Sequence, residues 1–333
     1  MRSQLVRFLA VLFLLLPAAV EVRSQSQGVI EGEVINATSG GTPVANVPVT
    51  LWALDGQDQM MLLEETTDGE GHVAFRALDA EAPGYQLEAE YQGVSYWSDA
   101  AAFSQGESFL SVPVIVYDST TSDADLWVER AHLILDFGAG TILVQELQIF
   151  FNGGNSTYVG SGPVGGDTIS FALPQGAAGL QLAEGLMACC AVETEEGFAY
   201  TRPLLPGEKD FFFAYGLAYN SADYTLSKEI HYPIRYLDVL VADRGVAVTG
   251  PGLIAQDPVF LEDRRYLHLT AQNLAPGDPL TLHLASLPLQ GGPAELAVSG
   301  SPVLAKVAMG LGTLVVLLVL VHPFLKRRAG EGS

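Results

Sequence analysis

The chain has 333 residues, with 38 acidic and 16 basic side chains and a formal net charge of −22 at pH 7. A surface this acidic repels the phosphates of nucleic acids, which excludes a nucleic-acid partner. The two cysteines are neighbours in the sequence and cannot join distant strands, so an apolar core has to hold the fold together.

The N-terminus has the pattern of a secretory signal peptide over residues 1–24. Arg2 and Arg7 precede an apolar run over residues 8–20, and polar residues follow it. About a dozen apolar residues are too few to cross a hydrocarbon core of ~30 Å, so cleavage is favoured over retention. We therefore expect a mature chain that begins near Gln25 and is exported from the cytoplasm.

Residues 28–118 predict a β-sandwich. Short apolar runs recur about every ten residues, with Gly, Pro, Asp and Ser between them, which is typical of many short strands joined by turns. Val47, Val49 and Leu51 alternate with polar or small residues, as a strand with one buried face requires.

Three stretches of this segment also carry a family likeness. They are Pro43–Leu51, Thr67–Leu78 with its Thr-Asp-Gly-Glu-Gly turn ahead of a strand, and Tyr85–Gly93, and the short stretch Gly32–Val34 precedes them in the same order. Together they resemble the carboxypeptidase regulatory-like domain, which has a transthyretin-type, carbohydrate-binding-like fold. The resemblance implies a spacer, an adhesive unit or a carbohydrate-binding module, and it implies no peptidase activity.

A polar, turn-prone stretch over residues 119–125 predicts a linker, and residues 126–298 predict a second, larger β-sandwich of jelly-roll or immunoglobulin type. Phe151–Gly160 and Leu205–Gly207 help to give this arrangement a resemblance to bacterial single-pass membrane proteins. The strands expected here are Leu126–Leu135, Thr141–Asn152, Thr168–Leu173, Gly179–Leu182, Gly197–Thr201, Lys209–Tyr219, Thr225–His231, Leu237–Ala242, Val246–Gly250, Tyr266–Ala271 and Leu280–Ser286.

Residues 303–325 predict one transmembrane helix, because the segment is almost wholly apolar and long enough to span a bilayer. Lys326, Arg327 and Arg328 follow directly, and such basic clusters stay on the cytoplasmic side. The sequence thus predicts a single-pass protein of the plasma (inner) membrane, with an extracytoplasmic N-terminal portion and a short basic tail over 326–333.

Four aromatic residues are candidates for a ligand-facing surface on the first domain: Trp52, Tyr91, Tyr96 and Trp97. Exposed aromatic rings stack on sugar rings, but burial in the core is the alternative for at least half of them. An exposed aromatic row flanked by amides and carboxylates would favour carbohydrate binding.

Cys189 and Cys190 offer a redox or metal-binding alternative. A strained disulfide between neighbours or a thiol metal site would require exposed, reactive sulfurs, although the CxxC spacing of such sites is missing. The other interpretation is two small, partly buried apolar residues.

Metal sites are not marked by any strong motif, and we expect no metal and no cofactor. His268 and His283 lie on successive predicted strands that a hairpin could bring together. The acidic turns Asp55–Asp58 and Asp68–Gly71 lack the D-x-D-x-D-G calcium loop, and ordinary β-turns explain them.

Catalytic motifs are also missing from the sequence, which lacks G-x-S-x-G, the P-loop, HExxH and a GxGxxG that opens a helix. Paired carboxylates for glycoside hydrolysis stay open, because so acidic a chain offers many pairs. We expect a non-catalytic, membrane-anchored interaction or scaffold protein of the cell envelope that binds another envelope protein. A carbohydrate-binding module is the first alternative, and a redox or metal accessory protein is the second.

Overall fold

The computed structural model describes residues 27–289, with gaps at 57, 139, 162–167, 184–185, 187 and 262–263. The predicted signal peptide, transmembrane helix and basic tail lie outside the described residues. Within them, no helix is long and apolar enough to cross a membrane. The described secondary structure consists of strands and one 3-10 helix, η1 (Ala188–Cys190), so the prediction of an all-β fold is confirmed.

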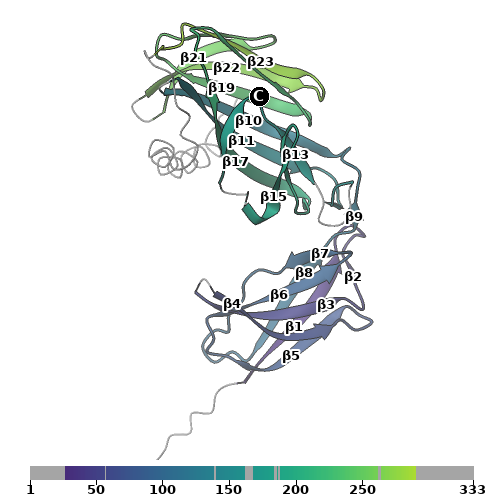
Figure 1. The fold of residues 1–333 in the computed structure, drawn as a ribbon. Helices are drawn as coiled ribbons and strands as arrows, with labels where there is room; N and C mark the ends of the chain where they lie inside the picture. The colour runs from purple at the N-terminus through teal and green to yellow at the C-terminus, as the bar shows by residue number, and fades with distance from the viewer. Residues whose placement is uncertain are drawn as a thin grey trace, which may run out of the picture. The chain divides into compact units, whose positions relative to one another are not determined.

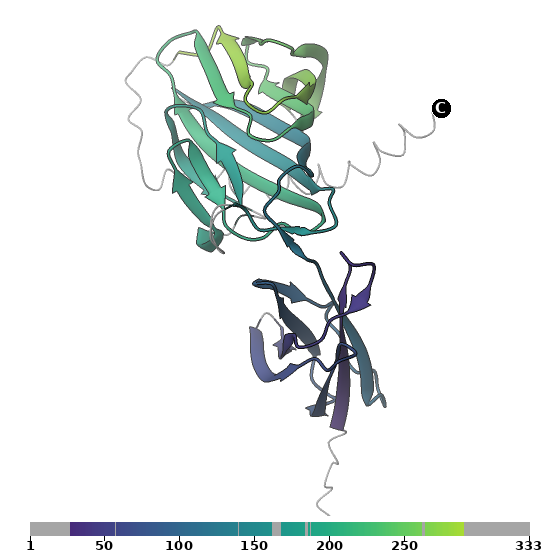
Figure 2. The ribbon, with the colours of Figure 1, turned by 90° about the vertical axis from the view of Figure 1, so that its right-hand side faces the viewer.

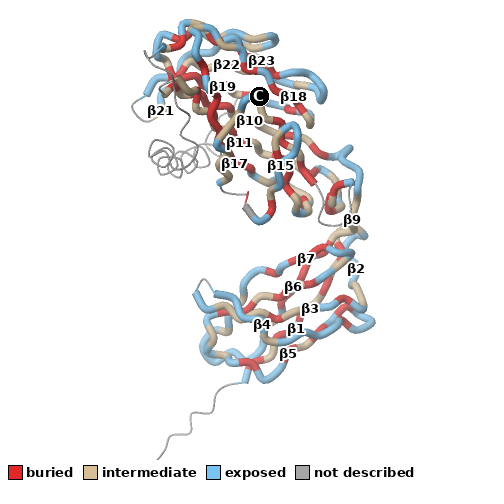
Figure 3. Tube along the Cα trace, viewed as in Figure 1, coloured by how far each residue is buried: buried red, intermediate tan, exposed pale blue. Residues whose placement is uncertain are grey.

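The chain folds as two compact units. The first contains the chain up to Tyr91 together with Ser95–Val116, and the second contains Gln92–Val94 and the chain from Tyr117 onward. Buried and exposed positions alternate along many of their strands (Figure 3), which is the pattern of strands with one face turned to a core.

The first unit has two four-stranded sheets (Figure 1). Among its described strands, the parallel pair joins the first strand to the last, β1 to β8. One sheet contains β2 (Thr42–Pro43), β1 (Gln27–Asn36), β5 (His72–Asp79) and β8 (Phe109–Val116), and the other contains β4 (Asp58–Thr66), β3 (Pro48–Asp55), β6 (Gly84–Tyr91) and β7 (Val94–Trp97).

These two sheets pack face to face, and they approach each other closely at Gly32 of β1. A Cβ atom at this position would lie 2.7 Å from Leu87 Cδ1 of the opposite sheet and 2.8 Å from Val73 Cγ1 of the neighbouring strand. Apolar side chains fill the space between the sheets. Among them, Ile30 and Phe75 are at most 1% exposed. The first unit is therefore a β-sandwich, as the alternation predicts.

The second unit is built on a long sheet of seven strands (Figures 1 and 2). Its centre is the parallel pair β10 and β19, and the remaining pairings are antiparallel. The order is β14 (Ala177–Leu182), β17 (Gly207–Ala218), β11 (Thr141–Asn152), β10 (Leu126–Gly138), β19 (Ile234–Ala242), β22 (Arg264–Leu274) and β21 (Ile254–Leu261).

Two three-stranded sheets cover one face of the long sheet. A cavity of about 40 Å³ between the layers is lined by Val128 of the long sheet, Phe171 of one short sheet and Leu280 of the other, so both short sheets lie on the same side. One short sheet contains β13 (Ile169–Ala172), β16 (Gly197–Tyr200) and β15 (Ala191–Thr194), and the other contains β18 (Tyr224–Glu229), β23 (Pro279–Ala285) and β20 (Ala247–Thr249).

Aromatic side chains hold the first of these short sheets against the long one. The ring of Phe171 stacks on Phe198 at 4.8 Å between centroids, and it meets Phe150, Phe211 and Phe213 edge-on at 5.2 to 5.7 Å. All five rings are buried. Edge-on and offset contacts of this kind add about 0.5–1.5 kcal/mol per pair beyond the burial itself.

The segment 119–125, expected to be a linker, belongs to the second unit. Ser119–Thr120 forms β9, which pairs with β12 (Thr157–Tyr158). The backbone of Gly153 also donates a hydrogen bond to the carbonyl of Asp125 at 2.9 Å. The polar residues of this segment form turns whose backbone groups are hydrogen-bonded to the rest of the second unit.

Candidate functional site

The outer face of the sheet β4-β3-β6-β7 carries two tryptophans of the first unit. The ring centroids of Trp52 on β3 and Trp97 on β7 lie 5.8 Å apart, with the planes tilted by 40°. The side chain of Trp97 is 42% exposed and Trp52 is half-buried. The indole Nε1 of Trp52 donates a hydrogen bond to Glu88 Oε2 at 2.9 Å, which fixes the ring.

Methionine and amide side chains extend this face toward the edge of the sheet. Met61 on β4, 52% exposed, lies opposite Trp52 in the strand register. Gln59 Nε2 donates to Gln86 Oε1 at 3.3 Å, and Gln86 Nε2 donates to the carbonyl of Ser98 at 3.0 Å. We call Trp52, Trp97 and Met61, with the two glutamines and Glu88 between them, the tryptophan face.

Tyr96 does not belong to the tryptophan face, and the prediction that it faces a ligand is wrong. Its side chain is 1% exposed in the core, because alternation along β7 turns Tyr96 inward and Trp97 outward. Tyr91 shares the inward parity of β6 with Leu87, and its hydroxyl accepts a hydrogen bond from Asn36 Nδ2 at 3.3 Å. The structure thus brings together two of the four predicted aromatics.

Cys189 and Cys190 are free thiols with unequal environments at η1. Cys189 is exposed and Cys190 is buried, with the two sulfurs 2.6 Å apart. Arg202 Nε donates to Cys190 Sγ at 3.0 Å. The hydrogen bond from Cys189, and next the one from Arg202, lower the pKa of Cys190 below its ordinary value, while the same thiol contact raises the pKa of Cys189. The exposure that the redox alternative requires is found for Cys189 and not for Cys190.

His268 and His283 lie in different sheets, so the hairpin that could have brought them together does not form. His268 lies on β22 in the long sheet, where it contacts Asp238 through Nε2 at 2.9 Å. His283 lies on β23 in a short sheet and pairs with Thr225 of β18. Successive strands can enter opposite layers of a sandwich, and these two do.

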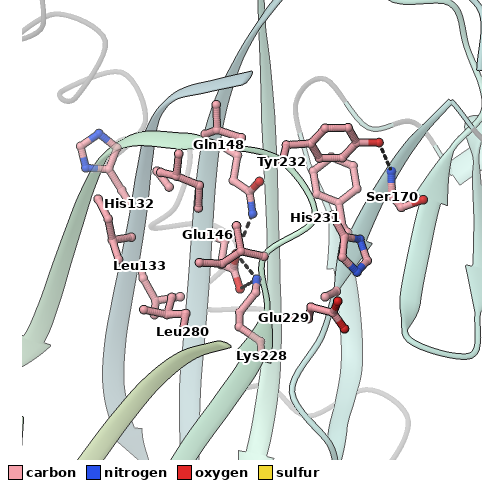
Figure 4. A pocket seen from close by; sticks show the side chains of 17 residues that line it. His132, Leu133, Glu146, Gln148, Ser170, Lys228, Glu229, His231, Tyr232 and Leu280 are labelled. Carbon is pink, nitrogen blue, oxygen red and sulfur yellow. Dashed lines mark hydrogen bonds and ion pairs between the residues drawn. The ribbon is translucent and has the colours of Figure 1, made fainter. Parts of the chain in front are cut away.

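A buried ion pair lies between the layers of the second unit, and sequence reasoning missed it. Lys228 Nζ lies 2.7 Å from both carboxylate oxygens of Glu146, with side-chain exposures of 7% and 5% (Figure 4). Tyr215 donates to Glu146 Oε1 at 2.7 Å, and Gln148 Nε2 donates to Oε2 at 2.9 Å. Burial, then the charge of Glu146, raise the pKa of Tyr215 well above its ordinary value.

No protein-family model matches the chain. No curated protein matches its sequence. Among solved structures, a 9R-lipoxygenase from Cyanothece PCC8801 matches with 13% identity and a TM-score of 0.21, over 28% of this chain and 16% of that one. An M1 zinc metallopeptidase from Deinococcus radiodurans matches with 13% identity and a TM-score of 0.30, over 50% and 43%.

The major pilin SpaA of Corynebacterium diphtheriae matches with 11% identity and a TM-score of 0.22, over 82% of this chain and 65% of that one. The chain spans less than half the length of the lipoxygenase and peptidase chains. Likenesses at these TM-scores carry no argument about catalysis or assembly. The resemblance of residues 28–118 to the carboxypeptidase regulatory-like domain stays a prediction.

Proposed function

We propose that this chain is a non-catalytic interaction protein of the cell envelope, anchored in the plasma membrane by residues 303–325, with both β-sandwich units outside the cytoplasm. The charged and apolar pattern of residues 1–24 supports export. The apolar stretch 303–325 followed by Lys326, Arg327 and Arg328 supports an anchor whose basic end lies inside.

The observation that carries the proposal is the tryptophan face of the first unit. Tryptophan is enriched among the residues that contribute most to protein–protein binding, and methionine is enriched in interfaces generally. Trp97 and Met61 keep 42% and 52% of their surface exposed on a sheet whose core is otherwise well filled. An exposed apolar cluster with a polar border is the kind of surface on which partners bind.

The edge strand β4 lies beside this face and indicates how a partner strand would bind. β4 ends the order β4-β3-β6-β7, and its sequence contains no lysine or proline to protect the edge. A partner strand can therefore add to it through backbone hydrogen bonds. Asp58, Glu64 and Glu65 on β4 favour a partner with basic side chains.

Crosslinking in the native membrane tests this proposal. The full-length chain is recovered together with its crosslinked partners, alongside a Trp97→Ser, Met61→Ser variant and a matched variant, Ile254→Ser with Phe260→Ser, on exposed apolar residues of β21 in the second unit. We expect a defined envelope protein to be lost with the first variant and kept with the second. Equal recovery with both variants would place binding elsewhere.

A carbohydrate ligand is the second candidate, because the tryptophan face also has the aromatic rings flanked by amides and a carboxylate that sugar binding requires. Gln59, Gln86 and Glu88 supply these polar groups. Glycan binding by the purified full-length chain, abolished by Trp97→Ala and kept by Phe260→Ala on the second unit, would favour this candidate. Recovery of a protein partner without any glycan binding would exclude it.

Membrane anchoring has its own test. We expect the full-length chain to stay in the membrane fraction at alkaline pH, and a chain that ends at residue 302 to be released. Retention of the shortened chain would show that residues 303–325 are not the anchor.

A further inference from the structure

Three side chains with metal-binding groups meet at one end of the second unit's short sheets. Glu196 lies in the turn between β15 and β16, Glu229 ends β18, and His231 follows two residues later. One ligand atom from each lies within 4.8 Å of the others. Figure 4 shows the side chains of Glu229 and His231 next to each other.

The spacing of these groups suits a shared ion. His231 Nε2 lies 3.4 Å from Glu196 Oε2. Two ligands of a tetrahedral zinc ion, with bonds of about 2.0–2.1 Å, lie roughly 3.3–3.4 Å from each other. The imidazole and the first carboxylate are thus already separated as two zinc ligands are, and a carboxylate oxygen of Glu229 lies within 4.8 Å of both.

Backbone contacts position the three residues from both sides. The amide of Leu173 donates to the carbonyl of Glu196 at 2.8 Å, which fixes the turn against β13. The next residue, Gly197, packs so closely on this strand that a Cβ atom would lie 2.2 Å from the carbonyl oxygen of Phe171. Ile230, between the other two ligands, accepts a backbone hydrogen bond from Gly277 at 2.8 Å. The backbone around the three residues is therefore already ordered, so binding an ion would require little further ordering of it.

The surroundings of the cluster attract a cation. An open cleft of about 930 Å³ beside it is lined by Glu193, Glu195, Glu196 and Glu229. Among the described residues that line this cleft, Lys228 carries the positive charge, and its ammonium group is bound to the buried Glu146. The four carboxylates consequently lack a local counter-charge from the lining, and clefts with one sign of charge concentrate ions of the other.

We propose that Glu196, Glu229 and His231 bind one Zn²⁺ ion. A histidine nitrogen combined with carboxylate oxygens favours zinc and its neighbours over Ca²⁺ and Mg²⁺, which take oxygen ligands. Three protein ligands leave a fourth coordination position open. Because Glu196 comes from one short sheet and Glu229 from the other, the ion joins the two sheets that cover the long one.

Zinc titration of the metal-stripped, full-length chain tests the site, with competition by a chromogenic chelator and thermal unfolding as readouts. We expect one equivalent of Zn²⁺ and a higher unfolding temperature for the second unit, because an ion that binds only the folded state stabilises it. His231→Ala and Glu229→Gln should each weaken zinc binding by about tenfold or more, since even changes outside the ligand set cost about that much.

Two controls keep the result specific. His283→Ala removes an exposed-strand histidine of the same unit, and Glu193→Gln removes a carboxylate of the cleft outside the cluster; both should bind zinc nearly as the unchanged chain does. Circular dichroism verifies that each variant is folded. The proposal is overturned by the absence of zinc binding, by unchanged zinc affinity in His231→Ala, or by Ca²⁺ binding as tightly as Zn²⁺.

Discussion

The two units place their carboxylates in opposite surroundings, although both are sandwiches of alternating strands. In the first unit Glu88 lies on the outer face and accepts one hydrogen bond, from the indole of Trp52. In the second unit Glu146 lies on the core face and accepts hydrogen bonds from Lys228, Tyr215 and Gln148. The carboxylate of Glu88 in the first unit therefore faces outward, whereas the carboxylate of Glu146 in the second unit is buried in the core.

The difference follows from how each sheet is covered. A single four-stranded sheet covers the core face in the first unit, whereas two short sheets share the cover in the second. Glu146 and Lys228 line the small cavity where residues of both short sheets meet the long one. A charge is tolerated at this junction only because its partner and its hydrogen-bond donors are present, since an unpaired buried charge is very unfavourable.

The largest expected effect comes from breaking this buried pair. Lys228→Met leaves the Glu146 charge buried without its partner and should destabilise the second unit by about 3–5 kcal/mol. The double variant with Glu146→Leu should regain most of that loss. Urea unfolding of the full-length chain measures both, and the unfolding of the first unit should not change.

The exposed pair of Arg235 and Glu129 is the matched control for this prediction. Its side chains are 49% and 31% exposed. Glu129→Gln should change stability by no more than about 1 kcal/mol. An equal loss from the exposed and the buried variants would contradict the comparison between the inner and outer carboxylates.

The next effect tests the close packing of the two sheets at Gly32. Gly32→Ala forces a methyl group against Leu87 and Val73 and should destabilise that unit by about 1–3 kcal/mol. Gly69→Ala, in a turn with open space around it, should have little effect. Thermal unfolding distinguishes the two variants, and equal stabilities would show that the sheets can separate at Gly32 without cost.

Alkaline pH should test the buried tyrosines of the second unit. Burial raises the pKa of Tyr232 to about 12, and it also raises that of Tyr215 and other tyrosines of the second unit. A phenol with a raised pKa in the folded state contributes stability that is complete below its unfolded pKa of about 10 and is lost as pH rises through the folded value.

The second unit should therefore lose stability between about pH 10 and pH 12, and Tyr232→Phe should lessen that loss. Denaturation at stepped pH measures it. Tyr236→Phe, on a residue that is 41% exposed, is the control. A pH profile that is the same for Tyr232→Phe and the unchanged chain would contradict the assignment.

The smallest effect concerns the thiols. Arg202→Met removes a hydrogen bond that lowers the pKa of Cys190, so this thiol should ionise at higher pH. Thiolate absorbance during a pH titration measures the shift, with Arg264→Met, an exposed arginine bound to Asp136, as control. A Cys190 titration unchanged by Arg202→Met would show that the guanidinium does not stabilise the thiolate.

Local alternation predicted much of the fold. The strand over Thr141–Asn152 and its two faces follow from a period of two, and the structure has this strand with the same bounds. The same period could have excluded a shared platform for Tyr96 and Trp97, because neighbours on a strand point to opposite faces. Strand β21 escaped prediction because most of its residues are exposed and it contains Pro258, so it lacks an apolar stripe.

Contacts between distant strands escaped prediction for a different reason. Glu146 and Lys228 are 82 residues apart, and nothing local indicates which layer either strand enters. Glu196 joins Glu229 and His231 through the meeting of two separate sheets. The pattern of each strand determines which face is buried, whereas tertiary packing alone decides which polar groups meet.

The parallel pairing of β1 with β8 has a consequence for how the first unit acquires its fold. β1 spans Gln27–Asn36 and its partner spans Phe109–Val116, so residues 37–108 have to be made before the pair can form. At about 5–20 residues per second, synthesis of that stretch takes roughly 4–15 s. During this time the first strand emerges with an open edge, and such edges are prone to pair with the wrong chain. A chaperone that binds nascent β1 would therefore protect this strand until β8, its late-synthesised partner, is available.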